Sequence, residues 1–280
     1  HQVRVLITGG SGFLGRHLAR KLLDRGDTVC IYSRDEVKQA NMMADFQEHP
    51  NLRMFIGDIR DAGRVQRATR GCDVVIAAAA LKRIETGFYN PSEMVATNIY
   101  GTQNCIDAAA AEKVQRFIFI SSDKAYQPIS PYGQSKALAE SLVLNANHVY
   151  GVMGPGYKAV RYGNISASTG SVIPRWRKIL ETSNTVPVTD PDATRFWMLV
   201  SEAVDFVLQA VDQVTDDLHI PAKLPAYRVA DLAHAMRAEH MQIMGLPRWE
   251  KKHEGMADGN TSDKAKRMTV EELRKALESV

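Results

Sequence analysis

The chain has 280 residues, 45% hydrophobic and 24% charged, enough for one large core or for a full domain carrying a smaller lobe. Its formal charge of +3 is mild, and no long basic run with interleaved aromatic residues occurs, so we expect no nucleic-acid partner. The longest uninterrupted apolar stretch, Val74 to Leu81, is far short of a bilayer span, so we expect a cytoplasmic protein without membrane contact. The three cysteines form no CxxC pair and the histidines form no ligand-spaced cluster, so we expect no metal.

Strands and helices are predicted to alternate through the first half of the chain. Short apolar runs with β-branched residues predict strands, and apolar residues at helical spacing predict helices. The predicted strands are 3–7, 28–32, 52–56, 74–78, 117–120 and 159–161, and the predicted helices are 13–25, 64–70, 92–111 and one that begins at Pro131. This alternation predicts an α/β fold, a Rossmann-like doubly wound parallel sheet with helices on both faces.

The regular alternation fades after about residue 163, where prolines interrupt shorter elements. We therefore expect an NAD(P)-binding Rossmann domain over 1–163. The rest, 164–280, is expected to form a smaller, mixed and mainly substrate-binding lobe, with the chain crossing back to the first domain. A terminal helix is predicted over 269–277, introduced by a Thr269 cap.

A glycine-rich turn joins the first predicted strand to the first predicted helix. Residues 8–15 read TGGSGFLG, where Gly9 permits the tight turn, Gly12 lets a diphosphate approach the backbone and Gly15 allows close helix packing. Free N–H groups at the helix start favour phosphate. The GxxGxxG spacing resembles that of the extended short-chain dehydrogenase/reductase superfamily. We expect a dinucleotide here, with contacts from Gly9, Ser11, Gly12, Phe13, Leu14 and Gly15.

The residues after the second predicted strand bear on the choice between NADP and NAD. Ser33 and Arg34, with Lys38 nearby, offer a hydroxyl and positive charge to a 2′-phosphate, whereas NAD enzymes usually present a carboxylate there. We therefore predict NADP, although Asp35 leaves NAD open, and Arg34 with Lys38 would otherwise be a solvated helix start. The superfamily resemblance further implies adenine contacts from Asp58 and Ile59, and a tight passage under the diphosphate formed by Ala78, Ala79 and Ala80.

Tyr132 and Lys136 are candidate catalytic residues that also contact the cofactor. Four residues apart on a predicted helix, they lie on one face and point into one cleft. The lysine ammonium and a cationic nicotinamide each favour phenolate, so we expect the pKa of Tyr132 to fall from about 10. The phenolate would take a proton from a sugar hydroxyl, to which Ser122 would hydrogen-bond.

Asp123 and Lys124 distinguish between two kinds of chemistry. Oxidising and re-reducing one carbon needs no further acid or base, whereas removing water from a 4-keto sugar needs a base at C5 and an acid at C6. Lys124 is the candidate base and Asp123 the candidate acid. A lysine base must lose its proton near neutral pH, which we expect burial or a neighbouring cation to achieve. A salt-bridged turn is the structural alternative.

Several strings make the resemblance more specific. Together they are similar to the inverting UDP-N-acetylglucosamine 4,6-dehydratase family over residues 4 to about 210. The strings are SRDE (33–36), AAALK (78–82), YNP (89–91), SDKA (122–125), YGQSK (132–136), RYGN (161–164), GSVIP (170–174), PVTD (187–190) and TRFW (194–197).

The resemblance implies a reaction sequence on one bound sugar nucleotide. Tyr132 would accept the 4-hydroxyl proton as C4 gives hydride to NADP, Lys124 would remove the C5 proton, and Asp123 would protonate the departing 6-hydroxyl. Hydride would return to C6, and reprotonation of C5 from the opposite face would invert that centre. The resemblance also implies substrate contacts from Lys82, Asn164, Ser171, Val172 and Arg195.

The chain departs from the family pattern in two places. Thr169 stands where the family usually has arginine, and residues 245–254 match the family's basic diphosphate-binding segment only loosely. Substrate identity is therefore less well determined than reaction type. A UDP-sugar 4-epimerase, a 5,6-dehydratase that stops at the alkene, and a nucleotide-sensing scaffold are the alternatives. The superfamily resemblance suggests a homo-oligomer, at least a dimer.

Overall fold

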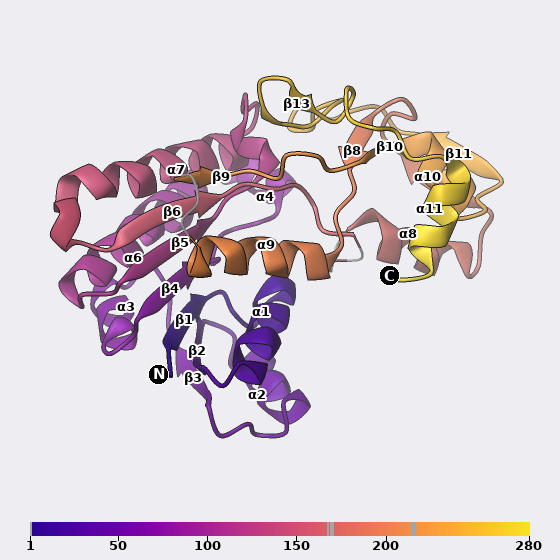
Figure 1. Cartoon of the computed structure of the whole chain (residues 1–280). Helices are drawn as coiled ribbons and strands as arrows, with labels where there is room; N and C mark the ends of the chain where they lie inside the picture. The colour runs from indigo at the N-terminus through magenta and orange to yellow at the C-terminus, as the bar shows by residue number, and fades with distance from the viewer. Residues whose placement is uncertain (1, 167, 169–170, 214–216) are drawn as a thin grey trace.

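A seven-stranded parallel sheet forms the centre of the molecule (Figure 1). The structure is a computed structural model, which describes residues 2–166, 168, 171–213 and 217–280. The strand order is β3-β2-β1-β4-β5-β6-β9, and it reverses beside β1, where doubly wound sheets bind nucleotides. The strands are β1 (Arg4–Thr8), β2 (Thr28–Ser33), β3 (Leu52–Ile56), β4 (Val74–Ala77), β5 (Arg116–Ile120), β6 (Gly156–Val160) and β9 (Leu218–His219).

Helices cover both faces of this sheet, because successive strand residues point to opposite sides. Val5 and Ile7 of β1 belong to one core, whereas Leu6 between them belongs to the other. The first core is closed by α1 (Phe13–Asp24), α2 (Glu36–Asp45) and α9 (Val200–Asp212), and the second by α3 (Ala62–Thr69), α6 (Thr102–Ala111) and α7 (Pro131–Tyr150). The predicted Rossmann-like doubly wound fold is therefore confirmed.

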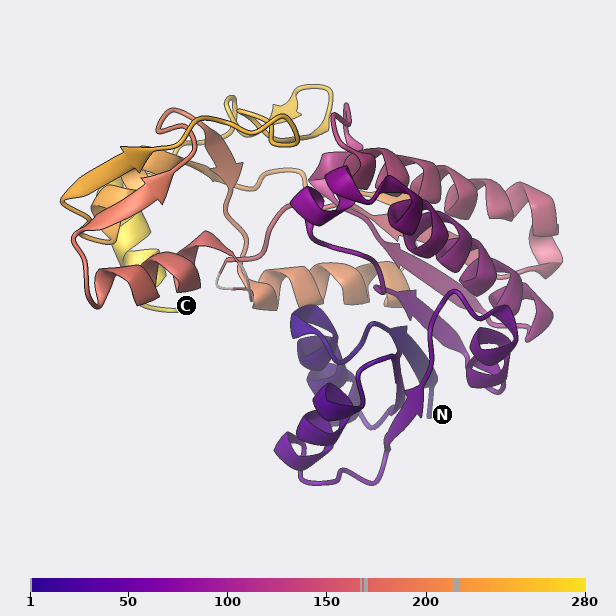
Figure 2. The same ribbon diagram turned by 180° about the vertical axis from the view of Figure 1, so that it is seen from behind.

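The C-terminal part of the chain forms a separate lobe with its own core (Figure 2). Trp176, Leu232 and Leu273 meet there from α8 (Val172–Leu180), α10 (Val229–Ala235) and α11 (Val270–Leu277). Small sheets accompany them, pairing β7 (Thr185–Val188) with β11 (His240–Ile243), β8 (Thr194–Phe196) with β10 (Ala226–Arg228), and β12 (Gly255–Ala257) with β13 (Asn260–Thr261). Between these elements the chain returns to the central sheet through α9 and β9. The expected domain boundary at 163 stays a prediction.

Predicted and observed elements differ in a few places. The helix expected over 92–111 is α5 (Pro91–Met94), a π-helical stretch over Val95–Gly101, and then α6. The short helix α4 (Ile84–Tyr89) was not anticipated, and α2 was considered only as the alternative interpretation of Arg34 and Lys38 as a solvated helix start. The Thr269 cap is confirmed, since its side chain accepts a hydrogen bond from the N–H of Glu272. Thr169 and Gly170, parts of the motif analysis, lie outside the described residues.

No helix in the described part of the chain is both long and apolar enough to cross a membrane.

Gly15 allows α1 to pack against the glycine turn, as the sequence predicted. A Cβ at Gly15 would lie 2.4 Å from Gly10 Cα, which is backbone and has little room to shift. We expect Gly15→Ala to lower the free energy of unfolding by about 1–3 kcal/mol through overpacking. Thermal unfolding measures the change. Gly63→Ala on α3 is the control, because the nearest atom to a Cβ there is 3.8 Å away; an equal loss in both variants would contradict the packing argument.

Candidate active site

The glycine turn between β1 and α1 lies at the point where the strand order reverses. Gly9 has φ +69°, and a Cβ on it would lie 2.8 Å from Ala79 Cα. The N–H groups of Ala78 and Ala79 both donate to Thr8 Oγ1 at 3.2 Å, which fixes this close approach. Gly12 begins α1 without a side-chain cap, so the first N–H groups of the helix face the turn. This cradle fits a diphosphate held by backbone N–H groups.

The residues predicted to favour NADP over NAD lie at the end of β2. Ser33 Oγ accepts a hydrogen bond from Ser11 Oγ at 3.1 Å. The Arg34 side chain is 63% exposed, and its guanidinium lies 4.0 Å from Asp58 Oδ2. Asp35 caps α2 instead, because its Oδ1 accepts from the Lys38 N–H at 3.0 Å. Asp35 was the carboxylate that kept NAD as an alternative cofactor, and it is engaged in capping α2.

Three lysines lie near the glycine turn, where the charge of Lys38 acts on Lys82 and the charge of Lys82 acts on Lys136. Lys82 Nζ lies 3.7 Å from the position that a Cβ of Gly12 would occupy. Lys82 is an exposed residue, yet desolvation by the surrounding protein and then the charge of Lys38 lower its pKa. Burial, together with the charge of Lys82, lowers the pKa of Lys136 to about 7. These lysines favour an anionic ligand. Because Lys82 lies beside the glycine turn, it is placed to contact a dinucleotide and not only a substrate.

The end of β5 holds Lys136 in place. Its Nζ donates to the carbonyl of Ile120 at 3.0 Å and lies 4.7 Å from the centre of the Phe119 ring. Both residues end β5, so the ammonium is fixed relative to the strand that carries the acid–base residues.

Tyr132 lies in the first turn of α7 and is 9% exposed. Ser130 caps this helix and Pro131 begins it, which fixes the direction of the turn. Burial raises the pKa of Tyr132, whereas the Lys124 ammonium and a hydrogen bond from Ser122 oppose the rise. The expected fall in the pKa is therefore wrong for the protein groups alone. Lys124 and Ser122 are nevertheless close enough to the phenol to favour phenolate. Tyr132 therefore lies beside the turn that contains Asp123 and Lys124.

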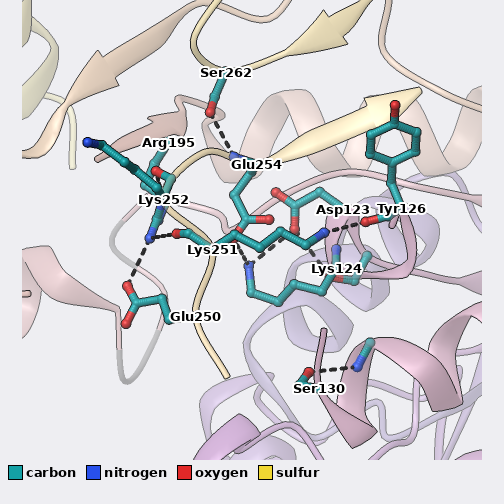
Figure 3. Close-up of polar contacts among 12 residues, drawn as sticks. Asp123, Lys124, Tyr126, Ser130, Arg195, Glu250, Lys251, Lys252, Glu254 and Ser262 are labelled. Carbon is teal, nitrogen blue, oxygen red and sulfur yellow. Dashed lines mark hydrogen bonds and ion pairs between the residues drawn. The ribbon is translucent and has the colours of Figure 1, made fainter. Parts of the chain in front are cut away.

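Asp123 and Lys124 lie in a 3₁₀ turn shortly after β5; the Asp123 side chain is buried, and the Lys124 side chain is 14% exposed. Lys124 Nζ donates to Asp123 Oδ1 at 3.3 Å and to Glu254 Oε1 at 3.0 Å (Figure 3). Gly163 closes the far side, since a Cβ there would lie 2.5 Å from Asp123 Oδ2. We call Asp123, Lys124 and Glu254 the buried triad. The sequence analysis did not single out Glu254, because it lies 130 positions from Lys124 along the chain.

The protonation of the buried triad differs from the expectation. Burial raises the pKa of Asp123 to about 6, although the Lys124 charge opposes the rise. Burial would also raise the pKa of Glu254, but Lys124 and Arg195 hold it below its ordinary range. For Lys124 burial acts downward, yet Asp123 and Glu254 together raise its pKa. The expected lowering of the Lys124 pKa is thus wrong, because the two carboxylates outweigh both burial and the charge of Arg195, each of which lowers it.

Glu254 belongs to a segment of the C-terminal lobe, residues 250–262, which we call the strap. Arg195 of β8 anchors it, donating to Glu250 Oε1 at 2.9 Å and to the carbonyls of Lys251 and Lys252 at 2.7 and 2.9 Å. At the other end, the N–H of Glu254 donates to the fully buried Ser262 Oγ at 2.9 Å. Figure 3 shows these contacts converging above the turn that carries Lys124.

The strap also contacts the Rossmann domain outside the buried triad. Lys251 Nζ donates to the carbonyl of Tyr126, and Tyr126 Oη donates to Asp258 Oδ1 at 2.6 Å. Arg161, at the end of β6, donates to the carbonyl of Met256 at 2.5 Å. The strap therefore covers one side of the turn that contains Asp123 and Lys124.

The predicted substrate residues are arranged around this centre in different ways. Asn164 is exposed on the loop after β6. Ser171 and Val172 begin α8, and Ser171 Oγ is buried with no partner among the described residues. Arg195 donates to Glu250 and to two carbonyls of the strap, so it holds the strap in place independently of any ligand. Among the described residues no group of three or more His, Cys, Asp or Glu side chains could hold a metal ion.

Comparison with known proteins agrees with this geometry. The family model described as "Polysaccharide biosynthesis protein" matches residues 5–275. A UDP-N-acetylglucosamine 4,6-dehydratase (inverting) of Campylobacter jejuni is 39% identical over 263 residues, which are 92% of this chain and 78% of that protein. A UDP-glucose 4-epimerase of Rickettsia massiliae is 34% identical over 93% of this chain and 79% of its own. The X-ray structure of Pen from Bacillus thuringiensis superimposes with a TM-score of 0.92 at 32% identity, covering 100% of this chain and 99% of that one.

The fold, the glycine turn and the comparisons define a sugar-nucleotide enzyme of the extended short-chain dehydrogenase/reductase type. Within it, the chain belongs to the polysaccharide biosynthesis protein family and to its inverting UDP-N-acetylglucosamine 4,6-dehydratases, which are lyases.

Proposed function

We propose that this protein uses NADP to remove water from a UDP-hexose, with UDP-N-acetylglucosamine as substrate, and that it inverts C5. The observation that carries the proposal is the buried Asp123–Lys124 pair beside Tyr132. An oxidation and re-reduction at one carbon would not need that pair. The 39% identity to the Campylobacter jejuni inverting dehydratase supports the same substrate class.

Each residue of the site has a role in this reaction. The glycine turn and Arg34 would hold NADP, which would supply a hydride acceptor for C4 and a hydride donor for C6. Tyr132 accepts the proton of the 4-hydroxyl, and Ser122 orients that hydroxyl. Lys124 takes the C5 proton, and Asp123, whose pKa lies near 6, gives a proton to the departing 6-hydroxyl. Lys82, Asn164, Ser171, Val172 and Arg195 are the proposed contacts to the substrate.

One product assay tests this function. UDP-N-acetylglucosamine is incubated with the protein, and product mass is followed together with proton NMR. Loss of water with a new C6 methyl signal supports the proposal. Loss of water with alkene signals and no methyl would indicate a 5,6-dehydratase. No turnover of any sugar nucleotide, with the cofactor still tightly bound, would indicate a nucleotide-sensing scaffold.

A UDP-sugar 4-epimerase is the second candidate, because epimerases of 33–34% identity match most of the chain. In that case Tyr132 and Lys136 suffice, and Asp123 and Lys124 only shape the pocket. The same assay separates the two activities, since an epimerase yields an isomer of unchanged mass.

The preference for NADP rests on Arg34, whose exposed guanidinium ends β2 while Asp35 is engaged in a cap. We expect Arg34→Ala to weaken NADP binding about tenfold or more, the effect of losing one charge-assisted hydrogen bond, and to change NAD binding little. Calorimetric titration with both dinucleotides measures this. Arg70→Ala, at the exposed end of α3, is the control. Equal weakening of NADP and NAD would refute the phosphate contact.

We also propose a cytoplasmic homo-oligomer, at least a dimer. The superfamily resemblance supports it.

A further inference from the structure

The sequence motifs assign no role to Glu254, yet the structure buries its carboxylate against the proposed base. The residue is 2% exposed, and its Oε1 lies 3.0 Å from Lys124 Nζ, closer than Asp123 Oδ1 at 3.3 Å. Its other oxygen, Oε2, is buried with no hydrogen-bond partner in the described part of the chain. Two buried carboxylates share one ammonium here, with Arg195 and Lys251 as the other cations that act on them, and buried charges of this kind contribute poorly to stability. Such an arrangement indicates a functional site.

The main chain around Glu254 is fixed by side chains that are themselves buried. Ser262 Oγ accepts from the N–H of Glu254, and the N–H of Ser262 donates back to the Glu254 carbonyl at 2.7 Å. Thr194, 1% exposed, is 2.7 Å from Ser262 through its Oγ1, and its N–H donates to the Lys252 carbonyl at 3.0 Å. The carboxylate is therefore held in one place before any substrate arrives.

We propose that Glu254 is a positioning residue for water elimination: it holds the Lys124 ammonium beside the sugar C5 and places a second negative charge next to the Asp123–Lys124 pair. This inference rests on the dehydratase function proposed above. Glu254 acts through Lys124 and does not itself touch the reacting atoms.

The pair balances its own protons in this scheme. Lys124 starts protonated and Asp123 ionised, and one Lys124 N–H bond breaks as an Asp123 O–H bond forms. Lys124 is then a neutral base and Asp123 a neutral acid. When the C5–H bond breaks, its proton goes to Lys124 Nζ; when the C6–O bond breaks, the leaving oxygen takes the proton of Asp123, and water departs. The pair ends in the state in which it began.

This internal transfer requires an ionised Asp123, which sets the direction of the pH dependence. Below about pH 6 Asp123 is already protonated while Lys124 keeps its own proton, so activity falls as the pH falls through 6. Burial and the charge of Glu254 raise the pKa of Asp123, whereas Lys124 and Arg195 oppose them. The charged or titratable groups packed around the pair are Tyr132 of α7, Arg195 of β8, Tyr227 of β10, and Lys251 and Glu254 of the strap.

Two substitutions separate charge from contact. Glu254→Gln keeps the shape and the acceptor for Lys124 but removes the charge. We expect its kcat/KM to persist to lower pH than in the wild type, with KM changed less than about threefold. Glu254→Ala removes both charge and contact. We expect its kcat to fall about tenfold or more with little change in KM, below the full contribution of a general acid or base.

A measurement without substrate keeps the inference separate from the proposed function. Carbon NMR of protein labelled at aspartate carboxyls, assigned with Asp123→Asn, follows the titration of Asp123. We expect a midpoint near 6 in the wild type and a lower one in Glu254→Gln. Asp258→Asn is the control, because it removes a strap charge that contacts Tyr126 and not Lys124.

Unchanged Asp123 titration in a folded Glu254→Gln protein would overturn the inference, as would wild-type kcat in Glu254→Ala. If Glu254→Ala does not fold, the Gln variant alone decides. A lowered midpoint together with no dehydration by the wild type would instead refute the proposed function and leave the charge effect of Glu254 intact.

Discussion

We expect Lys124→Ala to abolish water elimination and exchange of the substrate C5 proton, while NADP still binds. Lys124 is the one group of the buried triad assigned to C5, and its loss removes a base worth about 10²–10⁴ in rate. The side chain leaves behind two buried carboxylates, so Asp123 becomes harder to ionise. Mass spectrometry in deuterium oxide measures both elimination and exchange, and calorimetry measures cofactor binding.

The matched control for this substitution is Lys178→Ala, which removes an exposed ammonium from α8. It is expected to leave elimination unchanged. Dehydration retained in Lys124→Ala at a rate near that of the wild type would mean that another group removes the C5 proton. Retained C5 exchange without dehydration would leave Lys124 as the acid and not the base.

Tyr132→Phe is expected to stop the reaction one step earlier. Without the phenol oxygen nothing accepts the 4-hydroxyl proton, so neither reduced cofactor nor C5 exchange should appear, and turnover should drop by about 10²–10⁴. The ring stays in its buried position at the start of α7, so the fold should be kept. Absorbance of reduced nicotinamide in a single turnover distinguishes this block from that of Lys124→Ala, in which oxidation at C4 still occurs.

Tyr100→Phe is the control for the loss of a phenol, since Tyr100 is 65% exposed. A Tyr132→Phe protein that still forms reduced cofactor at the wild-type rate would exclude Tyr132 as the base for C4 oxidation. Thermal unfolding detects any loss of stability caused by removing the buried Tyr132 hydroxyl. In that case the single-turnover measurement is made only on the folded fraction of the variant.

Local signals in the sequence predicted the sheet and the cofactor turn well. The strand at 52–56 and the helix starts at Phe13 and Pro131 are as predicted, because apolar periodicity, glycine and proline act over a few residues. The π-helical stretch at Val95–Gly101 was not predicted, since periodicity cannot distinguish it from an α-helix.

Long-range contacts explain what the sequence could not predict. Glu254 reaches Lys124 only because the strap crosses from the C-terminal lobe, and nothing near Glu254 in the chain marks it as buried. The pKa directions of Lys124 and Tyr132 were wrong for the same reason. They depend on partners brought together by folding, two carboxylates for Lys124 and an apolar enclosure for Tyr132.

If Glu254 positions Lys124 as proposed, both lobes of the chain contribute to water elimination. A C-terminal lobe grafted from a relative to change the preferred sugar would bring a different strap, and with it a different counter-ion for Lys124. Such a chimera would recognise its new ligand and still fail at the elimination step unless Glu254, Ser262 and the Arg195 anchor were transplanted together. On this proposal, a change of substrate preference would have to preserve the contact between Glu254 and Lys124.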